Sequence, residues 1–130
     1  MTEPHWVLDE IAVAVHQMLI AEHGGSPGVR DVGLLESALA RPRQIFSYHP
    51  ESTIFDLAAG YGFGLAKNHP FIDGNKRAAL SVAATFLEIN AYNFDATEPA
   101  SVIVFEKLAA GDLSETELAK WFSDSSVRNA

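Results

Sequence analysis

The chain has 130 residues, of which 48% are hydrophobic and 20% charged, and this balance is that of an ordinary globular domain rather than a disordered chain. It contains no cysteine, which excludes disulfides and thiolate metal sites. The formal net charge of -8 repels nucleic-acid backbones and therefore argues against direct nucleic-acid binding.

No segment predicts export or membrane insertion. The first twenty residues carry three acidic residues and no basic cluster, which is unlike a secretory signal. Uncharged apolar runs such as residues 78–87 are much shorter than the roughly 20 residues of a membrane-spanning helix. We therefore expect a cytoplasmic protein that makes no membrane contact.

Apolar residues recur at helical spacing from Leu8 to Leu19, which predicts a first helix that ends at Gly24-Gly25. A second, short helix is predicted from Asp31, which can cap it, to Pro42, which should stop it. Residues 42–52 hold two prolines and two serines, and we interpret them as a loop or a short extended flap.

A third helix is predicted to begin at Thr53, because Asp56 stands three residues later and can complete a capping box. Three glycines follow at alternate positions inside this helix: Gly60, Gly62 and Gly64. Their spacing does not match the dinucleotide-binding fingerprint and no predicted strand precedes them. We interpret them as sites of close packing between helices.

The helix predicted from Gly74 or Asn75 to about Asn90 leaves so little polar surface that it should be the buried central helix. Thr97-Glu98-Pro99 can open another helix, which Gly111 would close.

A capping box of Ser114 and Glu117 predicts the last helix, and residues 123–130 are expected to be frayed. No strand alternation of useful length occurs. The sequence thus predicts one all-α domain over residues 1–130, a compact bundle of about six helices around a buried central helix.

The residues that can carry chemistry are concentrated at the junction between a loop and the central helix, in residues 69–77. The imidazole of His69 can accept a proton near neutral pH, and the carboxylate of Asp73 can hold a divalent cation. Pro70 disfavours a helical conformation at His69, which we therefore expect on an extended loop. Gly74 permits close approach to the free amides that open the helix, and three donors follow it: Asn75, Lys76 and Arg77.

Two cations in the first turn of a helix oppose the helix dipole, so Lys76 and Arg77 require a reason, and a bound polyanion supplies one. A carboxylate at Asp73 would repel a bare anion, whereas a bridging magnesium ion removes that conflict. The pattern predicts a nucleotide with its phosphates at the helix terminus and His69 as base, in phosphoryl or nucleotidyl transfer. The alternative is a loop histidine, a capping aspartate and two solvated cations.

Basic residues and histidines form two further patterns in the sequence. Six of the nine basic residues lie between residues 30 and 77, which predicts a locally basic site on an acidic body unless the clustering is chance. His16 and His23 stand seven residues apart on the first helix with no evident third ligand, and we interpret them as surface histidines.

Residues 69–80 resemble the signature of the Fic/Doc superfamily, His-x-Phe-x-Asp/Glu-Gly-Asn-Gly-Arg-x-x-Arg. The matching positions are His69, Phe71, Asp73, Gly74, Asn75 and Arg77. Lys76 replaces the glycine and Leu80 replaces the second arginine, and both departures are similar to the Doc (death-on-curing) branch. Residues 28–38 are also similar to Doc toxins.

The resemblance implies the Fic fold and a toxin kinase that uses ATP and Mg²⁺ to phosphorylate a threonine of translation elongation factor Tu. It assigns His69 as general base and Asp73 as magnesium ligand. It also assigns phosphate contacts to four positions: Gly74, Asn75, Lys76 and Arg77. No glutamate is followed by Gly or Asn, so the inhibitory motif of Fic proteins is absent and the resemblance implies a separate Phd-type antitoxin. The alternatives are AMP transfer to a protein hydroxyl and a non-catalytic antitoxin-binding module.

Overall fold

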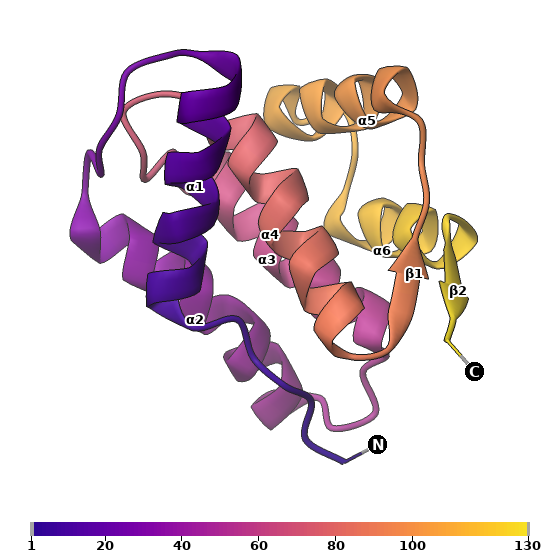
Figure 1. Ribbon diagram of the computed structural model, residues 1–130. Coiled ribbons are helices and arrows are strands. Elements are labelled where there is room, and N and C mark those ends of the chain that lie inside the picture. The colour runs from indigo at the N-terminus through magenta and orange to yellow at the C-terminus, as the bar shows by residue number, and fades with distance from the viewer. Residues whose placement is uncertain (1, 130) are drawn as a thin grey trace.

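The computed structural model describes residues 2–129, and over this range it contains six helices and two short strands (Figure 1). The elements in chain order are α1 (Asp9–His23), α2 (Val32–Tyr48), α3 (Ile54–Asn68), α4 (Asn75–Ile89), β1 (Tyr92–Phe94), α5 (Glu98–Ala110), α6 (Glu115–Asp124) and β2 (Ser126–Arg128). The prediction of an all-α fold with about six helices is confirmed.

Polar side chains cap four of the six helices at the positions that the sequence predicts. Asp31 accepts a hydrogen bond from the amide of Leu34 at 2.9 Å, and Thr97 caps α5 in the same way. Complete capping boxes open α3 at Thr53 and α6 at Ser114. Each cap supplies an acceptor to a main-chain amide that the helix itself leaves unpaired, so local sequence decides where these helices begin.

The centre of the domain is shared by α3 and α4. α3 packs against α2, α4, α5 and α6, and ten of its fifteen residues are buried. α4 buries seven of its fifteen residues along one face and lies beside α1 and α5 (Figure 1). α4 is therefore a core helix as predicted, although α3 is the more enclosed of the two, and one side of α4 is left for a site.

The three glycines of α3 permit close packing, which confirms the interpretation made from their spacing. A Cβ atom on Gly60 would lie 2.9 Å from Ile45, and one on Gly62 would lie 3.1 Å from Leu118. A Cβ atom on Gly64 would lie 3.2 Å from both the Cα and the carbonyl oxygen of Ala38. The nearest atoms at Gly60 and Gly62 belong to side chains that can shift, whereas those at Gly64 belong to the main chain of α2, so the packing is least able to adjust at Gly64.

The predicted end of the second helix at Pro42 is wrong, and so is the predicted loop as far as residue 48. α2 continues through Pro42 to Tyr48. A proline inside a helix costs about 3 kcal/mol because it removes a hydrogen bond and crowds the preceding turn. Pro42 is fully buried and packs against α3 at Gly60, so tertiary packing offsets this local penalty.

The predicted fraying of residues 123–130 is also wrong for the described part of that segment. β2 pairs in antiparallel fashion with β1, with Tyr92 opposite Arg128 and Phe94 opposite Ser126. Phe94 packs edge-on against Trp121 and so ties β1 to α6. Strands of three residues are too short to show an alternating pattern, and their pairing is decided by distant parts of the chain. Residue 130 lies outside the described residues.

No helix between residues 2 and 129 is both long and apolar enough to cross a lipid bilayer.

We predict that Gly64→Val destabilises the protein by about 1–3 kcal/mol, because the added side chain meets the main chain of α2 at Ala38, which cannot move aside cheaply. Urea unfolding measures the change. Gly33→Ala in the exposed first turn of α2 is the matched control, expected within about 0.5 kcal/mol of wild type. Equal stability of the two variants would contradict this account of the glycines.

Tyr61 provides a prediction about stability and pH. Its hydroxyl is buried and accepts a hydrogen bond from the amide of Val7 at 3.0 Å. Burial raises the pKa of Tyr61 from 10.0 to about 12, so the folded protein keeps a proton that the unfolded chain loses above pH 10. The wild type should therefore lose stability between pH 10 and 12 more steeply than Tyr61→Phe does.

At neutral pH the same variant should be less stable than the wild type by about 1 kcal/mol, because the buried amide of Val7 loses its acceptor. Denaturant unfolding of both proteins from pH 7 to 12 measures the difference in their free energies of unfolding. A difference that stays constant over that range would refute the claim that titration of Tyr61 destabilises the wild type at high pH.

Candidate active site

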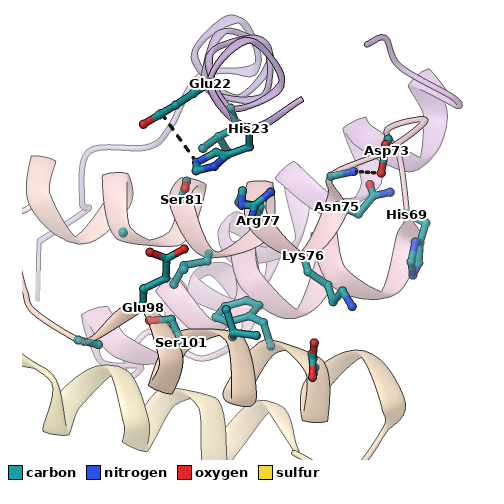
Figure 2. Close-up of a pocket in the computed structure, with 18 of the residues that line it drawn as sticks. Glu22, His23, His69, Asp73, Asn75, Lys76, Arg77, Ser81, Glu98 and Ser101 are labelled. Atoms are coloured by element: carbon teal, nitrogen blue, oxygen red, sulfur yellow. Dashed lines mark hydrogen bonds and ion pairs between the residues drawn. The ribbon is translucent and has the colours of Figure 1, made fainter. Parts of the chain in front are cut away.

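A cavity of about 820 Å³ opens at the N-terminal end of α4, between α1 and α5 (Figure 2). All six residues that the sequence singled out line this cavity: His69, Asp73, Gly74, Asn75, Lys76 and Arg77. α1 adds Glu22 and His23, and α5 adds the carboxylates of Glu98 and Glu106. The structure thus brings the predicted residues together in one place. The volume of the cavity lies within the roughly 300–1,000 Å³ of ordinary ligand sites.

The helix terminus in this cavity carries no side-chain cap. Gly74 precedes α4 with φ 74°, a left-handed conformation that favours glycine, and no side chain accepts from the first amides of the helix. The uncapped amides of α4 therefore remain for an anion, together with the positive end of the helix dipole.

His69 ends α3 in the left-handed conformation, with φ 48° and ψ 55°, so the predicted extended loop at this residue is wrong. Pro70 excludes the right-handed helical conformation at the preceding residue, as expected. A helix can end at a left-handed residue as well as at an extended one, and the left-handed residue also reverses the direction of the chain. A residue with a side chain pays about 1–3 kcal/mol for such a conformation, so surrounding contacts must maintain it.

The segment before α2 supplies those contacts. The guanidinium of Arg30 donates from Nε to the carbonyl oxygen of His69 at 2.8 Å and from Nη2 to that of Asn68 at 3.0 Å. The main-chain amide of Arg30 donates to the carbonyl oxygen of Pro70 at 2.7 Å, and an isolated antiparallel bridge joins Val29 to Phe71. This pairing fixes the path of the motif loop, residues 69–74.

His16 is buried, and the prediction that it is a surface histidine is wrong. Only 2% of its surface is exposed, and its ring stacks on Phe71 with the ring centroids 3.8 Å apart and the planes 5° from parallel. Its Nε2 lies 2.8 Å from the carbonyl oxygen of Asp73 and must donate there, because a carbonyl only accepts. The sequence held no local signal for this burial, because Ala12, four residues earlier on the same face and also buried, is identified as buried only by the structure.

Asp73 lies at the cavity with both carboxylate oxygens in contact with main-chain amides. Oδ1 accepts from Gly74 at 2.8 Å and Oδ2 accepts from Ser26 at 3.2 Å. A Cβ atom on Gly25 would lie 2.7 Å from Oδ2, and Gly25 also has φ 113°, so only glycine fits there. Among the described residues no group of three or more acidic or histidine side chains could hold a metal ion.

Asn75 holds the motif loop from inside. Its side chain is buried, accepts from the amide of Phe71 at 2.9 Å and donates to the carbonyl oxygen of the same residue at 3.0 Å. Both polar atoms are therefore engaged by the main chain. Phosphate binding by Asn75 stays a prediction. The donors still available for it are the main-chain amide and the second hydrogen of the side-chain nitrogen.

Lys76 and Arg77 are exposed at the start of α4, and within residues 2–129 neither forms an ion pair with a carboxylate. Lys76 points toward α5, whereas Arg77 lies nearer to Glu22 and His23 on α1 (Figure 2). Two cations without carboxylate partners at an uncapped helix end suit a polyanion, as the sequence predicted.

The wider basic cluster predicted from the sequence does not form in space. Arg41, Arg43 and Lys67 lie over aromatic rings outside the cavity, and Arg30 holds the main chain. Of the six clustered basic residues, only Lys76 and Arg77 line the cavity. Four carboxylates line it as well, those of Glu22, Asp73, Glu98 and Glu106. The site therefore combines a cationic helix end with four carboxylates, and apolar residues such as Leu80 and Phe105 form much of the remaining wall.

Comparison with known proteins shows the family to which this sequence belongs. A family model described as the Fic/DOC family matches residues 6–87. The chain is 34% identical to "Protein kinase doc" of Escherichia phage P1 over 111 residues, which are 85% of this chain and 86% of that protein. It is 46% identical to "Toxin Doc" of Mycolicibacterium smegmatis over 68 residues, which are 52% of each protein. The chain belongs to the Fic/DOC family.

We predict that His16→Leu destabilises the protein by about 1–3 kcal/mol, because the carbonyl oxygen of Asp73 loses a buried donor and Phe71 loses a flat partner. His16→Gln keeps a donor at similar reach and should recover part of that loss. Urea unfolding measures both variants, and His23→Leu, an exposed site on the same helix, is the control. Wild-type stability of His16→Leu would contradict the role given to this ring.

Proposed function

We propose that this protein is the toxin of a type II toxin–antitoxin pair and transfers phosphate from ATP to a protein hydroxyl. The supporting observation is that an imidazole, a carboxylate and two exposed cations from residues 69–77 meet in one cavity at an uncapped helix end. The names of its relatives, a protein kinase and a toxin, agree with this reaction.

The phosphates of ATP belong at the end of α4. The first amides of the helix donate to phosphate oxygens, Lys76 neutralises them as a point charge, and Arg77 can grip two oxygens at once. Glu98 and Glu106 on the α5 wall repel a polyphosphate, which confines it to the cationic end of the cavity.

Asp73 fits a magnesium ion that is shared with the nucleotide. Its exposed carboxylate accepts one amide hydrogen on each oxygen, and a carboxylate oxygen retains a further lone pair for a cation. Because no other acidic or histidine ligands join Asp73 in a cluster within residues 2–129, the ion would take its remaining ligands from phosphate and water. When bound, magnesium would neutralise charge on the phosphates.

His69 acts as the general base. Its imidazole is exposed at the cavity and can accept the proton of an attacking hydroxyl. The hydroxyl oxygen then bonds to the transferred phosphorus as the bond to the leaving ADP oxygen breaks, with charge on the phosphoryl oxygens met by Lys76, Arg77 and the amides of α4.

Transfer of phosphate rather than AMP is supported by the two departures from the Fic signature. Leu80 replaces an arginine and lines the cavity beside Ala84, so the wall at that position is apolar and offers no second guanidinium. Lys76 adds a side chain and a charge where the signature has glycine. Both changes favour a bound orientation that presents the γ-phosphate, instead of the α-phosphate, to the acceptor.

We further propose that the acceptor is a threonine of translation elongation factor Tu, so that the reaction stops protein synthesis in the cytoplasm. A Phd-type antitoxin would restrain the activity, since the sequence lacks the inhibitory glutamate motif of Fic proteins.

ATP labelled at either the γ- or the α-phosphate, added with the purified protein to bacterial lysate, tests the proposal. Label from the γ position should enter one protein of the size of elongation factor Tu. Label from the α position would instead establish AMP transfer. Growth arrest by the protein without transfer of either label would support a non-catalytic binding module.

His69→Ala should lower phosphate transfer by about 100-fold or more, because removal of a general base costs about 10²–10⁴ in rate. The same variant should relieve growth arrest when it is expressed without antitoxin. His5→Ala, at an exposed histidine outside the cavity, should behave as wild type. Undiminished arrest and transfer by His69→Ala would overturn the assignment of the base.

A further inference from the structure

We propose that Arg30 is a positioning residue for phosphate transfer, which orients the imidazole of His69 by holding the main chain on which that imidazole stands. The inference depends on the proposed role of His69 as general base. Arg30 lies outside the residues that line the cavity, so its guanidinium is not placed to bind the nucleotide itself.

The ring of His69 lacks the support that a catalytic base usually receives. Within residues 2–129 no side chain forms a hydrogen bond or an ion pair with this imidazole, and no aromatic ring stacks on it. In familiar catalytic groups a third residue orients the base through a hydrogen bond to its ring. Here the orientation of the ring is determined by the main chain and by the rotamer that this main chain permits.

The main chain at His69 is in a conformation that a residue with a side chain seldom adopts, with φ 48° and ψ 55°. The loss of its outside contacts would let the residue relax toward a commoner conformation. Such a change would turn the Cα–Cβ bond and move the imidazole away from the hydroxyl that it must deprotonate.

Arg30 is well placed to prevent that relaxation. Its planar guanidinium donates to the carbonyl oxygens of two successive residues, Asn68 at 3.0 Å and His69 at 2.8 Å. These carbonyls lie at the C-terminal end of α3, where the helix dipole favours a cation. A lysine carries the same charge but lacks a rigid fork that spans two acceptors.

Arg30 is itself anchored to the loop that it holds. Its main-chain amide donates to the carbonyl oxygen of Pro70 at 2.7 Å, one residue beyond His69. In addition, the side chain of Asn68 donates to the carbonyl oxygen of Leu34 at 2.9 Å. The peptide units around His69 are therefore held by hydrogen bonds to Arg30 and to the first turn of α2.

Steady-state kinetics of three variants tests this role. Arg30→Leu should lower kcat for phosphate transfer by about 10- to 100-fold while KM for ATP changes less than about twofold, because a misplaced base impairs chemistry rather than binding. Arg30→Lys should retain an intermediate rate. Arg43→Leu removes one exposed arginine that lies over Trp6 and is the matched control, expected to match wild type. An unchanged kcat for Arg30→Leu would overturn the proposal.

The double variant shows whether Arg30 acts through His69. In the His69→Ala background, Arg30→Leu should cause no further loss of rate, since the base on which it acts is already absent. A further loss of about tenfold or more would mean that Arg30 acts on the substrate or on the whole fold, and it would refute the positioning role.

NMR spectra of the histidine rings supply a readout that needs neither ATP nor a substrate. The His69 signals, assigned by their absence in His69→Ala, should shift or broaden in Arg30→Leu, while those of the buried His16 stay in place. Unchanged His69 signals would overturn the proposal, and Arg30→Gln serves for all measurements if Arg30→Leu does not fold. A wild-type protein that transfers no phosphate would refute the proposed function alone, because the ring signals decide the positioning by themselves.

Discussion

The pairing of the segment around residues 28–31 with the motif loop, residues 69–74, is the constraint on which the site depends. The two segments are far apart in the chain, and each is irregular, with a glycine of positive φ, Gly28, in one and the left-handed His69 in the other. Hydrogen bonds between their main chains, the side chain of Arg30 and the bridge from Val29 to Phe71 hold them together. Neither segment has internal helix or sheet hydrogen bonds that would maintain its conformation alone. Each therefore depends on hydrogen bonds to the other.

The buried side of the motif loop is supported as firmly as its outer side. The ring of His16 lies flat on Phe71 and its Nε2 reaches the carbonyl oxygen of Asp73, while Asn75 binds both polar groups of the Phe71 main chain. Polar groups that would be costly to bury unpaired are thereby satisfied within a largely apolar core. The consequence is a division of roles in which His16 and Asn75 hold the loop from the buried side, while the exposed side chains of His69, Asp73, Lys76 and Arg77 line the cavity.

The electrostatics of the cavity are more selective than those of a simple basic pocket. Two cations and an uncapped helix end meet four carboxylates in one cavity, on a chain of net charge -8. This charge pattern favours an anion at the end of α4 and disfavours one beside the carboxylates of Glu22, Glu98 and Glu106. Leu80 limits the positive charge of the cavity further, because its apolar side chain lines the wall where the Fic signature has an arginine.

The sequence by itself determined the features that depend on neighbouring residues. The caps at Asp31, Thr53, Thr97 and Ser114, the six helices and the group of residues 69–77 could all be predicted, because capping and amphipathic periodicity act over a few positions. Only the tertiary structure decided the continuation of α2 through Pro42, the pairing of β1 with β2, the burial of His16 and the left-handed turn at His69. Each of these depends on contacts with residues far along the chain, and the packing of those residues outweighs the local conformational preference. Local sequence patterns do not predict such contacts.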